Sequence, residues 1–293
     1  MRTFRVRYGR DLRAGLAAAG LVATMAGGPA LSAQTPAPST PAPAKPAPPA
    51  SKPPAAAPPA KTAAAPADAS LPSARSIIDR HVTAVGGRKA IMSHTSSHAT
   101  GTVNVAGSGI TGALDVYSAA PNKSLVRINL GGIGEIVEGF DGVNGWTVSA
   151  ITGPALTQGK ELDQKKFDAD FYSDLHEDGR YASIKTVEKT TFDGRPCYKV
   201  SLVRKDGSED FDYYDVATGL KAGMTGTRET PMGPTAVTQV TTEYKKFGGI
   251  LIPTAVKQTA MGAEQRLAIT SVEFDNVPPS TFDPPAQIKA LLK

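Results

Sequence analysis

Along residues 96–274, hydrophobic positions tend to recur at every second residue, the period of a β-strand with one buried face. In residues 109–118, Leu114 and Val116 share one face with Ile110. In residues 124–130, Val126 and Ile128 do the same, while the residues between them are polar or charged. A sheet with one apolar and one polar face is typical of antiparallel pairing.

The stretch EGFDGVNGWTVSA, residues 138–150, predicts a β-hairpin around which the other strands are arranged. Its two Asx-Gly pairs, Asp141-Gly142 and Asn144-Gly145, tolerate the backbone conformations of tight turns. After the turn, Trp146, the only tryptophan, shares a strand face with Val148. Further strands separated by turn signals indicate a meander; the predicted strands are residues 181–190, 196–204, 209–215, 222–227, 236–245, 251–259 and 264–274.

Helical spacing appears at the start of this region and once inside it. Residues 72–85 and 88–94 predict two helices before the first strands, and residues 286–292 predict a short one at the end. Residues 159–175 predict an amphipathic helix, because Phe167, Phe171 and Leu175 recur every four residues. This apolar stripe fits a helix packed permanently over the sheet and equally fits a movable lid across a cavity.

The first 70 residues differ in composition from the rest of the chain. Five arginines followed by an uncharged segment ending PALSA predict a secretory signal peptide over residues 1–33, cleaved after Ala33. An uncleaved membrane anchor is the alternative. Residues 34–70 contain 12 Pro and 14 Ala, which predicts an extended, disordered linker. Residues 71–293 are then expected to form one domain.

Charge is distributed unevenly between these parts. The chain has a formal net charge of +5, but residues 71–293 hold 24 Lys and Arg against 25 Asp and Glu. The predicted domain is therefore close to neutral. This removes the electrostatic argument for a nucleic-acid partner, which requires a basic surface.

Motifs of known chemistry are absent from the sequence. It has no G-x-S-x-G nucleophile elbow, phosphate-binding loop or H-E-x-x-H pair. Cys197 is interpreted as a small strand residue. The acids within residues 209–215 are interpreted as a solvated edge-strand face, and those within 163–174 as the polar side of a helix. We therefore expect no catalytic residues, no metal site and no cofactor.

Seven segments in order resemble the bacterial outer-membrane lipoprotein-sorting family, the LolA-like proteins. These segments are AVGGRKAI (84–91), PNK (121–123), EGFDGVNGW (138–146), DADFYSDL (168–175), FDGRPCYKV (192–200), YYDVATGL (213–220) and YKKFGGILIP (244–253). The resemblance implies an α+β, mainly β fold: a curved antiparallel sheet or incomplete β-barrel whose covering helices enclose a cavity for acyl chains. The Pro/Ala-rich linker departs from the simple carrier of that family. The chain also lacks a lipid-attachment cysteine.

These observations lead to one hypothesis and one alternative. The hypothesis is a periplasmic, monomeric, non-enzymatic carrier of lipid or lipoprotein acyl chains, which is not integral to the membrane after cleavage. The alternative is an envelope interaction module that contacts a protein partner without lipid cargo. Seven sheet residues are predicted to line the cavity and two helix residues to close it: Leu114, Val116, Val126, Ile128, Phe140, Trp146 and Val148, with Phe167 and Phe171.

Overall fold

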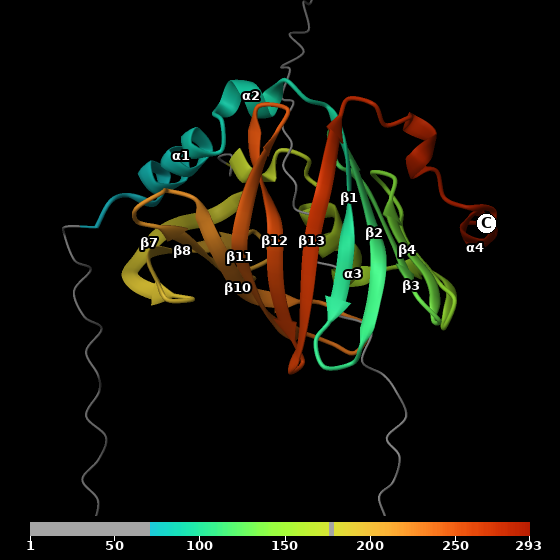
Figure 1. Cartoon of the computed structure of the whole chain (residues 1–293). Helices are drawn as coiled ribbons and strands as arrows, with labels where there is room; N and C mark the ends of the chain where they lie inside the picture. The colour runs from blue at the N-terminus through green and yellow to red at the C-terminus, as the bar shows by residue number, and fades with distance from the viewer. Residues whose placement is uncertain (1–70, 176–178) are drawn as a thin grey trace, which may run out of the picture. The chain divides into compact units, whose positions relative to one another are not determined.

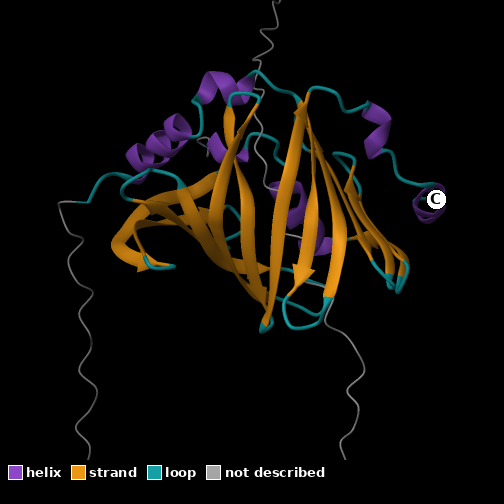
Figure 2. Cartoon of the chain, in the orientation of Figure 1, coloured by secondary structure: helices purple, strands orange, loops and turns teal. Residues whose placement is uncertain are grey.

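The computed structural model describes residues 71–175 and 179–293, and within them thirteen strands form one antiparallel sheet. The predicted signal peptide and linker lie outside the described residues. Figure 2 shows the strands as one continuous curved layer. In chain order the strands are β1 (Ser96–Val105), β2 (Ile110–Ala119), β3 (Lys123–Leu130), β4 (Gly134–Phe140), β5 (Gly145–Ser149), β6 (Gly153–Thr157), β7 (Tyr181–Phe192), β8 (Arg195–Arg204), β9 (Glu209–Asp215), β10 (Lys221–Arg228), β11 (Thr235–Phe247), β12 (Ile250–Ala260) and β13 (Ala263–Phe274).

Almost every strand pairs with its neighbour in the chain, so the sheet is built from successive hairpins. The order runs β6-β5-β4-β3-β2-β1-β13-β12-β11-β10-β9-β8-β7, and only the β1–β13 pairing joins distant segments. Within the described part of the chain, β6 and β7 have no partner strand on their outer edges, so the sheet does not close. The predicted fold class, a mainly β protein with a curved antiparallel sheet and covering helices, is confirmed.

The predicted central hairpin is formed by β4 and β5. Oδ1 of Asp141 accepts hydrogen bonds from the backbone N–H groups of Val143 (2.8 Å) and Asn144 (2.7 Å), which fixes the turn. Gly139 then lies opposite Trp146 in the ladder. A Cβ atom at Gly139 would collide with the indole ring of Trp146, so this position requires glycine.

Register divides the side chains of the sheet into an inner and an outer face, because directly opposed residues point to the same side. On the inner face Leu114 lies opposite Ile128, which lies opposite Ile136. On the outer face Tyr117, Leu125 and Gly139 form the corresponding row.

Helices cover both faces (Figure 1). On the inner face, α1 (Ala74–Ala84) packs Ile77 and Ile78 against β8 and β9. α3 (Gly159–Asp168) lies over β5, where its Leu162 approaches Gly145. On the outer face, the C-terminal η3 (Pro279–Phe282) and α4 (Ala286–Leu291) cover Trp146. α2 (Arg88–Met92) and η2 (Ser173–Leu175) are short connections.

The predicted helix over residues 159–175 is wrong in its second half, since α3 ends at Asp168. The backbone N–H of Phe171 donates to the carbonyl oxygen of Pro121 (3.0 Å), and Oδ1 of Asp170 accepts from the N–H of Tyr172 (3.0 Å). These bonds replace the helical ladder. Phe171 therefore packs with Val85 and Ile91 against β11 and β12, away from the stripe that it was predicted to share with Phe167.

Within the described ranges, no helix combines the length and the hydrophobicity needed to cross a membrane.

Candidate functional site

A cavity of about 190 Å³ lies between the inner face of the sheet and the elements that cover it. Its walls come from β2 and β7–β13, and from α1, α3 and η2. The lining is divided by chemistry. One part is hydrophobic and another carries charged side chains, and we describe these parts as the apolar half and the charged half.

The apolar half is formed by β2, β12 and β13. Its members are branched aliphatic side chains whose positions alternate along each strand: Leu114, Val116, Val256, Leu267 and Ile269. Leu114, Val116 and Leu267 are almost fully buried and belong to the main hydrophobic core. These residues offer no hydrogen bond to a ligand, so they suit hydrocarbon.

The charged half contains four cations and four carboxylates, contributed by β8–β10 and the segment from α3 to Arg180. The cations are Arg180, Arg204, Lys221 and Arg228, and the carboxylates are Asp168, Asp174, Asp210 and Asp212. With His81 neutral, the formal charges of these lining residues cancel.

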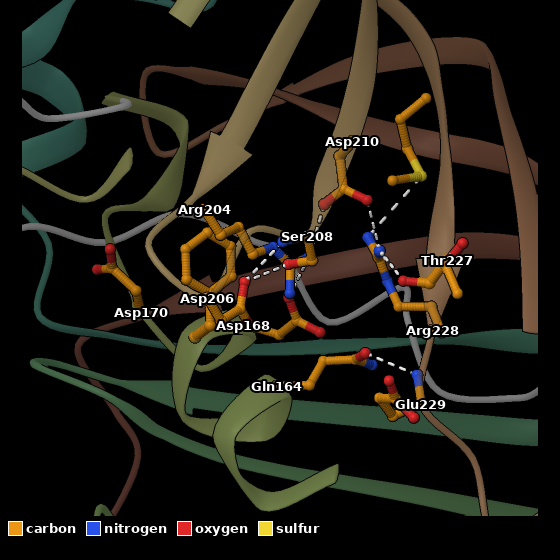
Figure 3. Close-up of polar contacts among 12 residues, drawn as sticks. Gln164, Asp168, Asp170, Arg204, Asp206, Ser208, Asp210, Thr227, Arg228 and Glu229 are labelled. Atoms are coloured by element: carbon orange, nitrogen blue, oxygen red, sulfur yellow. Dashed lines mark hydrogen bonds and ion pairs between the residues drawn. The ribbon is translucent and has the colours of Figure 1, made fainter. Parts of the chain in front are cut away.

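Asp210 is at the centre of the charged half (Figure 3). It accepts a hydrogen bond from Nη2 of Arg204 on Oδ2 (2.5 Å) and one from Nη1 of Arg228 on Oδ1 (2.8 Å). Side chains of all three are at least nine-tenths buried. Shared carboxylate bonds of this kind offset the desolvation of two buried guanidinium groups.

Strand pairing brings these three residues together. Arg204 has the parity of Val200 and Leu202 on β8, so it must point inward. Leu202 lies directly opposite Asp210, and β9 lies between β8 and β10. Gly226 of β10 leaves the space that the Asp210 carboxylate occupies, because a Cβ atom there would overlap Oδ1.

A second ion pair lies beside the first. Nζ of Lys221 is 2.7 Å from Oδ1 of Asp212, and the hydroxyl of Tyr214 donates to Oδ2 of Asp212 (3.1 Å). Burial, reinforced by the negative charge of Asp212, raises the pKa of Tyr214 well above its usual value. Tyr214 is therefore a neutral hydrogen-bond donor.

At the edge of the cavity, Phe167 of α3 contacts the guanidinium groups of Arg180 and Arg204. The Cζ atoms of Arg180 and Arg204 lie 3.7 Å and 4.1 Å from the centre of its ring, in cation–π geometry. Nη2 of Arg180 also donates to the carbonyl oxygen of Phe167 (2.8 Å). The end of α3 is thus held by cations.

Polar contacts also attach the middle of α3, which has no fully buried residue. Nζ of Lys165 lies 3.1 Å from Oε2 of Glu138 on β4. Oε1 of Gln164 accepts from the backbone N–H of Glu229 (2.8 Å). Burial raises the pKa of Glu138, and the neighbouring Lys165 opposes that shift.

Comparison with known proteins identifies the architecture. Neither a protein-family model nor a curated protein matches the sequence. Among solved structures, a DUF1329 family protein from Desulfovibrio piger is similar with a TM-score of 0.51 at 14% identity, covering 73% of this chain and 98% of that chain. A LolA superfamily protein from Nitrosomonas europaea is similar with a TM-score of 0.50 at 12% identity, covering 73% and 99%. The chain has a LolA-like fold.

The fold brings together only some of the residues predicted to surround a ligand. Leu114, Val116 and Phe167 line the cavity. Val126 and Ile128 belong to the same hydrophobic core on the inner face but do not line the cavity.

The remaining four predicted residues lie farther from the cavity. Phe140 is fully buried on the inner face, opposite Gly145. Phe171 packs against Val85 and Ile91. Trp146 and Val148 lie on the outer face beneath Phe282 and Ile288.

The interpretation of the acids within residues 209–215 as a solvated edge-strand face is wrong for Asp210 and Asp212, although Glu209 is exposed. β9 lies between β8 and β10, and Asp210 and Asp212 are 7% and 1% exposed. Asp168 and Asp174, interpreted as the polar side of a helix, also line the cavity, and Asp174 lies in η2, beyond the end of α3. A signal was present in the sequence: Arg204 continues the inward alternation of Val200 and Leu202, which places a charge on a buried face and requires a carboxylate partner.

The described residues contain no cluster of three or more His, Cys, Asp and Glu in metal-binding arrangement. Cys197 is fully buried among Phe192, Tyr213 and Ala222, on the opposite face of β8 from Leu202. Burial raises the pKa of its thiol, which disfavours the reactive thiolate.

Proposed function

We propose that this protein is an exported, non-enzymatic carrier that binds the acyl chain of a lipid or lipoprotein against the apolar half of its cavity. The observation that carries the proposal is the row of aliphatic side chains facing an internal space. Each methylene group that leaves water for such a wall contributes about 0.8 kcal/mol. The predicted signal peptide supports a periplasmic location, and the resemblance of seven sequence segments to the lipoprotein-sorting family supports lipid or lipoprotein cargo.

The size of the cavity supports a binding mode in which α3 moves. At about 190 Å³ it is smaller than the pockets of roughly 300–1,000 Å³ that hold drug-sized ligands. A long acyl chain therefore requires additional space. α3 is held over the inner face by ion pairs and hydrogen bonds and buries no residue fully, so its displacement exposes little hydrocarbon to water.

The test is lipid uptake by a variant in which the cavity is filled. Ile269 is partly buried and lines the cavity, and an Ile269→Trp side chain occupies space that a ligand needs. Excluding about two methylene groups weakens binding of a fluorescent fatty acid about tenfold. Native mass spectrometry of protein from the exported fraction reports copurified lipid in the same samples.

Val148→Trp is the matched control, because it adds the same side chain to a partly buried position on the outer face. Both variants must first show cooperative unfolding. Unchanged uptake by Ile269→Trp, or a loss caused by Val148→Trp instead, would place the ligand elsewhere. Absence of uptake by the unaltered protein would favour the interaction module.

A further inference from the structure

We propose that the charged half of the cavity binds the head of the ligand, and that this head is zwitterionic, carrying a phosphate and an ammonium group, as in phosphatidylethanolamine. The inference rests on the proposed function, because the same ligand places its acyl chain on the apolar half. It adds the chemical class of the head and the residues that select it.

The charges of the side chains that line the cavity balance. Four cationic and four anionic side chains line the cavity. An anionic head adds an uncompensated negative charge next to four carboxylates. A cationic head adds an uncompensated positive charge next to four cations. A head that carries both signs leaves the sum unchanged, which matters because unpaired charges are costly in a buried site.

Among the described residues, the buried Nε–H donor of Arg204 lacks an acceptor. Arg204 is 5% exposed, and both of its described ion pairs are made through Nη2, to Asp210 and to Asp168. Buried donors are nearly always satisfied. A phosphate oxygen is an acceptor that matches a guanidinium group in both charge and geometry.

The carboxylate of Asp168 is placed to receive the ammonium group. In the described part of the chain, Asp168 makes one ion pair, 3.9 Å from Nη2 of Arg204, and accepts no hydrogen bond from its neighbours. It lines the cavity at the end of α3. Burial raises the pKa of this carboxyl group, and a nearby ammonium group would reverse that effect.

The experiment compares lipids that share acyl chains and differ in their heads. Full-length protein is titrated with short-chain phosphatidylethanolamine, phosphatidylglycerol and diacylglycerol, each competing against a fluorescent fatty acid. We expect phosphatidylethanolamine to bind about tenfold more tightly than the other two, the effect of one charge-assisted hydrogen bond.

Arg204→Lys keeps the positive charge beside Asp210 and removes the Nε–H donor. We expect it to reduce the preference for phosphatidylethanolamine about tenfold while leaving diacylglycerol binding unchanged. Arg195→Lys is the matched control, since Arg195 lies on the same strand as Arg204, donates to the carbonyl oxygens of Ala222 and Thr241, and does not line the cavity; it should retain the preference. Urea unfolding of both variants verifies that they fold.

Equal affinity for all three lipids, or an unchanged preference in Arg204→Lys, would overturn the head-group assignment and leave acyl binding intact. Failure of every lipid to bind would instead overturn the proposed function. Tight binding of glycerophosphoethanolamine, which has no acyl chains, would identify a soluble polar ligand and overturn both.

Discussion

The two halves of the cavity are built on different strands of one sheet, and their side chains depend on their neighbours differently. In the apolar half, Leu114 and Leu267 contact other aliphatic groups, and any hydrocarbon of similar volume would serve. In the charged half, Arg204 and Arg228 both depend on the single carboxylate of Asp210. Removing one side chain is therefore expected to lower stability by a small amount in the apolar half and by a large amount in the charged half.

The largest loss of stability is expected from Asp210→Ala in the charged half. Removing the shared carboxylate leaves two buried guanidinium groups without their main partner. Breaking a buried ion pair in this way typically costs about 3–5 kcal/mol of unfolding free energy. Urea denaturation measures the change.

Asp163→Ala provides the baseline for that measurement, because it removes a carboxylate that is 70% exposed in its pair with Lys166. Exposed pairs of this type contribute about 0–1 kcal/mol. Similar values for Asp210→Ala and Asp163→Ala would mean that the charged half is hydrated, which contradicts its described burial.

An intermediate effect is expected from Leu114→Ala in the apolar half. Substitutions of this kind in protein cores cost about 2–5 kcal/mol. Leu114 lines a cavity on one side, where it has no packing contacts to lose, so we expect a loss near the lower end, about 2–3 kcal/mol. Ile128→Ala, in the same core but away from the cavity, should cost more; the opposite order would argue against an internal space beside Leu114.

The smallest effect concerns pH and Asp168. Burial raises the pKa of its carboxyl group, against the opposing influence of Arg228 and Arg204. The folded protein therefore keeps this proton to a higher pH than the unfolded chain does, and it loses stability as pH rises through the folded-state pKa. Asp168→Asn removes this loss.

We expect the urea midpoint of Asp168→Asn to exceed that of the unaltered protein at pH 7.5, with the difference shrinking as the pH is lowered toward 5. Asp163→Asn, whose carboxylate is exposed, should show no such convergence. A difference that grows at lower pH would mean that Asp168 is stabilised as an anion in the folded protein.

The fold could be predicted from the sequence because its signals are local. Alternation along each strand and turn pairs such as Asp193-Gly194 gave β7–β13 to within about two residues of their observed bounds. The end of α3 could not be predicted this way. It depends on a hydrogen bond between Phe171 and Pro121, fifty residues apart in the chain, which helical spacing cannot detect.

The site was less predictable because its chemistry depends on partners from different strands. Residues 209–215 were correctly predicted as a strand, yet only the position of β9 between β8 and β10 makes Asp210 a buried partner of two arginines. Trp146 shows the reverse problem. Alternation predicted the strand face that Trp146 shares with Val148. It could not predict that Phe282 and Ile288, from the distant C-terminus, cover that face.

The free edges at β6 and β7 have a consequence for the length of the proposed acyl ligand. Closing a sheet fixes its diameter through strand number and stagger, whereas this sheet ends at two free edges. We therefore expect that the interior can widen by bending of the sheet, with the ladder hydrogen bonds retained. We expect one such scaffold to accommodate hydrocarbon chains of several lengths, with the covering helices, rather than the backbone of the sheet, setting the upper limit.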